Sequence, residues 1–213
     1  MSNLSIKLQS KALKEMAQQK PYRRNLAHFE YDVLPKVYKG STDTELFCEL
    51  LKVKKGDEVW DIGTGTGLIA LAAKKKGAKY VLATDINPSA VKNAKQNSLR
   101  LGLKIETRIV NIFGTIKKKF DIITFNPPFT NHTSKEKHEM SFWDKDNKTV
   151  KKFFSGLKDY LKKDGQAYIA WSSFGKIQIL KKIAQEYGYT LNEIGRRTGK
   201  RRFVYYIFEI KTK

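Results

Sequence analysis

The sequence has little of what builds crosslinked, metal-binding or membrane-embedded proteins. It holds one cysteine, Cys48, which excludes a disulfide framework, and its three histidines are too scattered to predict a zinc site. No apolar run approaches the roughly 18 residues that a membrane-spanning helix needs. Residues 1–9 hold too few apolar side chains for a secretory signal. We therefore expect a cytoplasmic protein with no resident metal and no membrane partner.

Acidic residues are also scarce. The chain has 21 of them against 42 lysines and arginines, which gives a formal net charge of +21. The excess runs along the whole chain and is densest in residues 191–213. A protein that neutralises phosphates releases their counterions, so nucleic acid is the expected partner. The alternative is a lysine-rich composition that only keeps the surface soluble.

The 213 residues suit one domain, and most of their length alternates strands with helices. This order predicts an α/β fold with a doubly wound, mostly parallel, seven-stranded sheet and helices on both faces. Residues 197–200 have turn chemistry and no helix, so the terminal strand is expected to run antiparallel. The predicted helices cover residues 3–19, 42–52, 68–76, 88–101, 148–161 and 176–187. The predicted strands cover residues 58–62, 80–84, 105–110, 120–125, 166–171, about 190–197 and 202–210.

A glycine-rich loop joins the first predicted strand of this series to the next helix. Its sequence is Asp61-Ile62-Gly63-Thr64-Gly65-Thr66-Gly67, with a glycine at every second position. Leu68 stands where the dinucleotide fingerprint needs glycine, and no lysine followed by serine or threonine closes the loop. Dinucleotide and P-loop sites are therefore excluded. Asp61 instead suits a ligand that carries a positive charge or an amino group.

Two further polar residues follow strands at the same edge of the predicted sheet. Asp85 ends the second strand, eighteen residues after Gly67, where a doubly wound sheet places a carboxylate against ribose hydroxyls. Asn111 follows the third strand and is placed to meet an adenine. The alternative for Asp85 is a cap on the helix that begins at Pro88. Asp61, Asp85 and Asn111 thus lie at the ends of three strands on the same edge of the sheet, and together they favour a nucleoside ligand.

With these residues the sequence resembles the class I S-adenosylmethionine-dependent methyltransferases over roughly residues 35–211. The resemblance implies a Rossmann-like methyltransferase sheet, S-adenosyl-L-methionine as cofactor and S-adenosyl-L-homocysteine as product. It also implies roles for the residues named above. Asp61, Gly63, Gly65 and Gly67 correspond to the methionine-binding loop, Asp85 to the ribose carboxylate and Asn111 to the adenine contact.

The fourth strand of the series ends in Asn126-Pro127-Pro128-Phe129. Two consecutive prolines cannot continue a central strand, so the chain breaks off at the open edge of the sheet. There the Asn126 side-chain oxygen and the Pro127 carbonyl can accept N–H bonds from a planar amine or carboxamide, which favours a tetrahedral, attacking nitrogen. Phe129 offers a face for stacking. The tetrad resembles the signature of methyltransferases that act on amino groups of nucleobases or of glutamine; the alternative is a proline-stiffened turn.

Residues 37–46 resemble the segment before the glycine loop in HemK-type glutamine methyltransferases, which implies that Asp43 and Thr44 help close the methionine end of the site. Two features depart from that family. Phe129 stands where HemK-type enzymes usually carry tyrosine, and phenylalanine is more familiar in ribosomal-RNA enzymes that modify adenine N6 or guanine N2. The HemK-type helical substrate domain is also missing. We therefore divide the chain into a basic N-terminal extension, residues 1–40, and a class I methyltransferase domain, residues 41–213.

Basic residues around the last predicted turn are expected to bind RNA phosphates, although a solvated turn is the alternative. They are Arg196, Arg197, Lys200, Arg201 and Arg202. The sequence therefore predicts an N-methyltransferase that modifies an exocyclic base amine, adenine N6 or guanine N2, in ribosomal or transfer RNA. One rival is a HemK-like enzyme that methylates glutamine N5 in a translation factor or ribosomal protein. A second rival is a non-catalytic RNA-binding scaffold. A partner subunit is left open.

Overall fold

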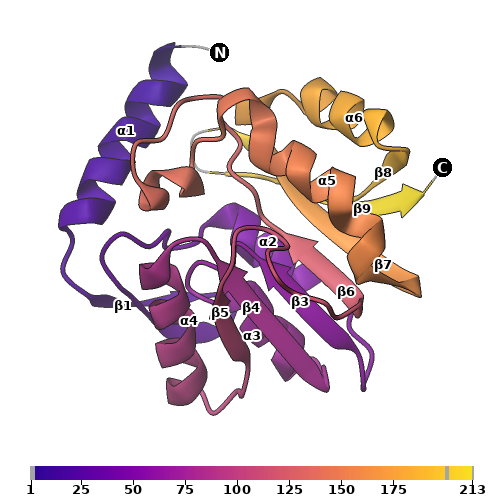
Figure 1. Ribbon diagram of the computed structural model, residues 1–213. Helices are drawn as coiled ribbons and strands as arrows, with labels where there is room; N and C mark the ends of the chain where they lie inside the picture. The colour runs from indigo at the N-terminus through magenta and orange to yellow at the C-terminus, as the bar shows by residue number, and fades with distance from the viewer. Residues whose placement is uncertain (1–2, 200–201, 213) are drawn as a thin grey trace.

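The computed structural model describes residues 3–199 and 202–212 (Figure 1). No helix within these residues is long and apolar enough to cross a membrane. The helices are α1 (Asn3–Gln18), α2 (Thr42–Leu50), α3 (Leu68–Lys75), α4 (Pro88–Arg100), α5 (Lys148–Tyr160) and α6 (Ile177–Glu186). The strands are β1 (Tyr22–Leu26), β2 (Phe29–Val33), β3 (Glu58–Ile62), β4 (Tyr80–Asp85), β5 (Glu106–Ile109), β6 (Phe120–Phe125), β7 (Leu161–Ser172), β8 (Tyr189–Thr198) and β9 (Val204–Thr212). Short 3-10 turns lie at Lys137–Ser141, Lys145–Asn147 and Ser173–Gly175.

The predicted seven-stranded sheet is confirmed, with the strand order β5-β4-β3-β6-β7-β9-β8. The pairs from β5 to β7 are parallel, and β9 runs antiparallel between β7 and β8. The terminal strand is therefore antiparallel, as expected, but it lies inside the sheet, and β8 forms the edge. The strand order reverses between β3 and β6, which is where a doubly wound sheet opens a crevice at its carboxyl edge.

Each face of the sheet carries its own hydrophobic core, because successive strand residues point to opposite faces. On β3, Val59 belongs to the core that α2, α3 and the β1–β2 hairpin cover. The next residue, Trp60, is fully buried in the second core, which α5 and α6 cover. Its indole N–H donates to the Thr84 hydroxyl at 2.9 Å, so this large side chain ties β3 to β4 as it fills the core.

The β1–β2 hairpin is an element that the sequence analysis missed. Its two-residue turn is Ala27-His28, and both residues have positive φ, at 51° and 61°. Such turns are normally signalled by Asn-Gly or Asp-Gly, so the usual sequence signal is absent here. Arg23 and Arg24 lie in β1, whose partner, β2, packs against the core through Phe29 and Tyr31.

Two buried asparagines of α4 hold the hairpin on the domain. Asn97 accepts a hydrogen bond from the Asp32 N–H at 2.8 Å and donates to the carbonyls of Asp32 and Thr66, each at 2.9 Å. Asn93 accepts from the Leu34 N–H and donates to the Asp32 carbonyl, both at 2.8 Å. Since Thr66 belongs to the glycine-rich loop, the N-terminal hairpin and that loop share a hydrogen-bonded anchor.

Helix α1 is amphipathic and packs through a small cluster of its own. Leu13 and Met16 are buried against Trp143, which lies in the segment between β6 and α5, with Tyr38 and Phe142 beside them. Figure 1 shows α1 alongside that segment. Trp143 is therefore an anchor for α1. The predicted boundary at residue 40 stays a prediction, but the residues before it make specific contacts with the rest of the chain.

We predict that Asn97→Ala lowers the free energy of unfolding by about 2–4 kcal/mol, because buried backbone groups of Asp32 and Thr66 lose their partners at ~1–3 kcal/mol each. Urea unfolding followed by circular dichroism measures this. Lys95→Ala, an exposed change on the same helix, is the control and should stay within about 0.5 kcal/mol of wild type. Equal losses in the two variants would contradict the anchoring role of Asn97.

Candidate active site

The carboxyl ends of the central strands bring the predicted residues to one edge. Ile62 of β3 is in register with Thr84 of β4 and with Phe125 of β6. The glycine-rich loop, Asp85 and Asn126 therefore begin at the same level of the sheet. This alignment follows from parallel pairing, in which neighbouring strands end together.

The glycine loop needs glycine for two physical reasons. Gly63, Gly65 and Gly67 have φ values of 67°, 57° and 90°, in the left-handed region that other residues rarely adopt. A Cβ atom on Gly67 would also lie 3.0 Å from the Ala94 Cβ, so only glycine lets α3 begin this close to α4. The backbone of this loop is thereby exposed to the crevice.

Asp85 is bonded to the glycine loop and does not cap the following helix. Its carboxylate accepts from the Gly65 N–H at 3.0 Å and from the Asn87 N–H at 2.9 Å. Asn87 is the N-cap of α4, where its side chain accepts from the Ser89 N–H. The alternative of Asp85 as the helix cap is therefore wrong. Burial raises the pKa of Asp85 above its usual value.

Asp61 lies beneath the glycine loop, away from the crevice. It is 1% exposed, and its carboxylate accepts from the hydroxyls of Thr64 at 2.7 Å and Thr124 at 2.8 Å. The Ala70 N–H is a further donor. Burial raises the pKa of Asp61 to about 6, which these hydrogen bonds partly oppose. The geometry assigns this side chain to holding the loop in shape, and its predicted contact with an amino group stays a prediction.

A first cavity, here the glycine-loop cavity, runs along this edge. Its walls include the predicted residues Thr44, Gly63, Gly65, Asp85 and Asn111. Further lining residues come from the segment between β6 and α5 and from the first turn of α5: Lys137, His138, Met140, Ser141 and Thr149. The enclosed space is about 100 Å³, whereas ligand pockets usually hold roughly 300–1,000 Å³.

A second cavity, here the aromatic cavity, lies on the other side of Asn126 and holds about 620 Å³. Phe129, Tyr205 and the stacked pair Phe174 and Phe203, with ring centroids 3.6 Å apart, supply its aromatic wall. Helix α1 and the acidic residues Asp43 and Glu45 also border it. From α1 the lining residues are Leu8, Gln9, Ala12 and Glu15.

Asn126 stands where the two cavities meet. It lines both of them, together with Tyr38 and Ser141. The other tetrad residues divide between the cavities: Pro128 lines the glycine-loop cavity, while Pro127 and Phe129 line the aromatic cavity. A chemical group that is transferred from a ligand in one cavity to a ligand in the other therefore passes the tetrad residues.

The Asn126 side chain has one fixed end and one free end. Its Nδ2 donates to an Asp43 carboxylate oxygen at 2.7 Å, and Asp43 also accepts from the hydroxyls of Tyr38 and Ser41 at 3.0 and 2.9 Å. A carboxylate can only accept, so it holds the amide nitrogen toward itself. Asn126 Oδ1 is buried and has no partner in the part of the chain that the structure describes. The free end is therefore a hydrogen-bond acceptor.

The structure places Asp43 and Thr44, in the segment 37–46, along different cavities. Their expected role in closing the methionine end of the site stays a prediction. Thr44 lines the glycine-loop cavity, whereas Asp43 borders the aromatic cavity and bonds Asn126. The contact between residues 83 positions apart had no signal in the sequence.

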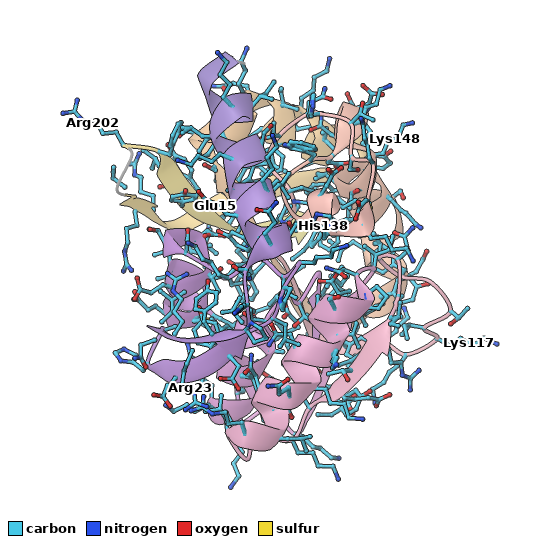
Figure 2. All side chains as sticks on the ribbon, turned by 90° about the vertical axis from the view of Figure 1, so that its left-hand side faces the viewer. Glu15, Arg23, Lys117, His138, Lys148 and Arg202 are labelled. Atoms are coloured by element: carbon cyan, nitrogen blue, oxygen red, sulfur yellow. The ribbon has the colours of Figure 1, made fainter. Side chains whose placement is uncertain are left out.

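The basic residues around the last turn are only partly free. Arg197 pairs with Glu49 at 2.6 Å and with Glu45 at 3.3 Å, and Arg196 pairs with Glu193 at 3.2 Å. Arg202 projects away from the molecule in Figure 2. Lys200 and Arg201 lie outside the described residues. Phosphate contacts by this group stay a prediction.

Comparison with known proteins identifies the family. Residues 37–195 match the family model named methyltransferase small domain. A Methanocaldococcus jannaschii protein named "putative protein N5-glutamine methyltransferase" is 37% identical over 156 residues, which cover 70% of this chain and 79% of that one.

Solved structures agree on the fold. The ribosomal protein L11 methylase of Lactobacillus delbrueckii subsp. bulgaricus has a TM-score of 0.64 at 23% identity, over 85% of this chain and 84% of that one. The T. thermophilus 16S rRNA N2 G1207 methyltransferase, in complex with AdoMet and guanosine, has a TM-score of 0.66 at 20% identity, over 89% of this chain and 50% of that one. The chain therefore belongs to the methyltransferase small domain family and is an S-adenosylmethionine-dependent methyltransferase.

Proposed function

We propose that this enzyme methylates the side-chain amide nitrogen of a glutamine in a protein of the translation machinery, in the cytoplasm. The observation that carries the proposal is the junction of the two cavities at Asn126, whose unpartnered Oδ1 is a fixed acceptor for an N–H group. A carboxamide nitrogen supplies such N–H groups and is a poor nucleophile until they are held.

The glycine-loop cavity has the chemistry that S-adenosylmethionine requires. Asp85 offers a carboxylate for the ribose hydroxyls, Asn111 a side-chain amide for the adenine, and Gly63 and Gly65 a backbone that admits close approach. Thr44 lies along the same cavity. The cofactor, once bound, supplies an electrophilic methyl group on a sulfonium centre and leaves as S-adenosylhomocysteine.

The chain itself supplies orientation and polarity to the attacking nitrogen. Asn126 Oδ1 and the Pro127 carbonyl accept its N–H bonds, and this draws the nitrogen lone pair out of amide conjugation toward the methyl group. Pro127 has no N–H to compete for these oxygens. Acceptors fixed before the reaction stabilise the transition state without reorganisation, and Asp43 provides that fixation for Asn126.

A protein acceptor is favoured by the charge of the aromatic cavity. Acidic Glu15, Asp43 and Glu45 line it together with basic Arg24 and Lys39, and Glu45 with Glu49 pairs with Arg197. The charges that line the cavity nearly balance, which suits a neutral side chain better than a phosphate backbone. The 37% identical relative carries a glutamine methyltransferase name and aligns over 79% of its length.

An exocyclic amine of an RNA base is the second candidate. Its support is the net charge of +21 and the stacking face of Phe129. The labelled basic residues Arg23, Lys117, Lys148 and Arg202 lie at separate edges of the view in Figure 2. The fold similarity to an rRNA N2-guanine enzyme is compatible with it. The same tetrad chemistry applies, since such an amine is planar as well.

We predict that Asp85→Ala raises the dissociation constant of S-adenosylmethionine at least ~10-fold, because two ribose hydroxyls lose a charged acceptor. Isothermal titration calorimetry measures the change. Asp159→Ala removes an exposed acid from α5 and should bind as wild type does. Unchanged affinity in folded Asp85→Ala would remove Asp85 from the cofactor site.

The choice between acceptors is tested with tritium-labelled cofactor and total protein or total RNA from cells that lack the gene. We expect label in protein, located on glutamine by mass spectrometry. Label in RNA alone would promote the second candidate.

Asn126→Ala should cut turnover ~100-fold or more, because the reacting nitrogen loses one fixed polar partner, with cofactor affinity nearly unchanged. Near-normal turnover in this variant would contradict the role assigned to the tetrad.

Asp43→Asn tests whether Asp43 positions Asn126. An amide can donate as well as accept, so Asn126 would no longer be held with its oxygen toward the acceptor. We expect kcat to fall ~10-fold with little change in cofactor affinity. Ser41→Ala removes a neighbour that also bonds Asp43 and should cost less than threefold. A large loss of cofactor affinity in Asp43→Asn would instead support the predicted role of Asp43 at the methionine end.

A further inference from the structure

One face of α1 forms a wall of the aromatic cavity. Leu8, Gln9, Ala12 and Glu15 line the cavity. Gln9 also follows the i, i+4, i+7 spacing of Leu13 and Met16, which pack against Trp143. This packed stripe holds α1 in place, and Gln9 is its member that also lines the cavity.

Gln9 is the polar member of the buried stripe that it forms with Leu13 and Met16. It is 6% exposed, and its Oε1 has no hydrogen-bond partner among residues 3–199 and 202–212. A buried amide oxygen without a partner is unfavourable, so a position that served packing alone would be better filled by leucine or methionine. The free oxygen therefore indicates a partner from outside the chain.

The same cavity holds a second unpartnered oxygen, Asn126 Oδ1. Three other buried side-chain atoms lack partners in the described chain, on Thr130, Trp143 and Trp171, and none of those residues lines the aromatic cavity. Two of the five unpartnered atoms thus belong to residues that line one cavity, and both are amide oxygens, which only accept. A ligand that donates at two places would satisfy both oxygens.

We propose that the aromatic cavity is the acceptor site and that Gln9 Oε1 binds a second N–H group of the glutamine-bearing peptide, beside the nitrogen that Asn126 holds. This rests on the proposed function, and it adds a recognition residue from α1. A peptide offers such a group in each residue, whereas a carboxamide alone fills a small part of about 620 Å³. Gln9 thus selects and aligns the acceptor, and Asn126 acts on the nitrogen that reacts.

Gln9→Leu tests the inference because it keeps the volume and removes the oxygen. The Michaelis constant for a glutamine peptide, identified by the labelling experiment, should rise ~10-fold, with kcat within about threefold of wild type and cofactor affinity unchanged. Thermal stability should stay equal or increase, because an unpaired buried polar group is gone. Gln18→Leu makes the same change at an exposed position of α1 and should match wild type in every measurement.

The outcomes separate the two proposals. If wild type transfers methyl groups to the peptide and Gln9→Leu has an unchanged Michaelis constant, the recognition role is wrong while the proposed function stands. A lower melting temperature with an unchanged Michaelis constant assigns Gln9 to structure and also overturns the inference. If wild type methylates no glutamine, the proposed function fails, and the peptide assignment for Gln9 fails with it.

Discussion

A carboxylate buried beneath the glycine loop holds the working edge of the sheet together. Asp61 of β3 accepts hydrogen bonds from Thr64 in the loop, from Thr124 on β6 and from the Ala70 backbone at the start of α3. Loss of one of these donors would leave the buried carboxylate short of a partner at a cost in folding free energy. The interaction therefore holds the loop, β6 and α3 in position relative to β3. The raised pKa of Asp61 shows that burial still outweighs the donors. The contact of Asp85 with the loop and the position of Asn126 both depend on this arrangement.

The division of the site into two cavities follows from where β6 stops. The two prolines after Asn126 end the strand, and they turn to opposite sides, Pro127 toward the aromatic cavity and Pro128 toward the glycine-loop cavity. Asn126 is thereby left at the boundary, and Asp43 reaches it from α2, an element remote in sequence. The Asp43 carboxylate fixes the orientation of the Asn126 amide, and this orientation determines which chemical groups can bind at the junction of the two cavities.

Local patterns in the sequence predicted most of the sheet, and they singled out several residues that line the cavities at its carboxyl edge. Strands β3 and β6 match their predicted bounds because their burial follows a simple pattern and clear turn signals flank them. The glycine loop and the tetrad were recognisable because rare residues stand close together there. These features are local, and local features can be read from a sequence.

Contacts between distant residues could not be predicted in this way. The hairpin turn at Ala27-His28 lacks glycine and asparagine, so its conformation depends on docking to α4. The pairing of Arg197 with Glu49, 148 residues away in sequence, also had no local signal. Gln9 is polar and lies in a polar helix, so only the fold distinguishes it from the exposed residues around it.

The anchoring of the N-terminal hairpin has a consequence for synthesis in the cell. Asp32 and Asn97 are 65 residues apart, so at ribosomal rates of ~5–20 residues per second the hairpin waits on the order of 3–13 s for its docking surface. Trp143, against which α1 packs, emerges later still. This segment is therefore synthesised before the surfaces on which it docks and folds into place only after them. Its lysines at positions 7, 11, 14 and 20 suit that delay, since a charged, weakly apolar segment resists aggregation while it waits.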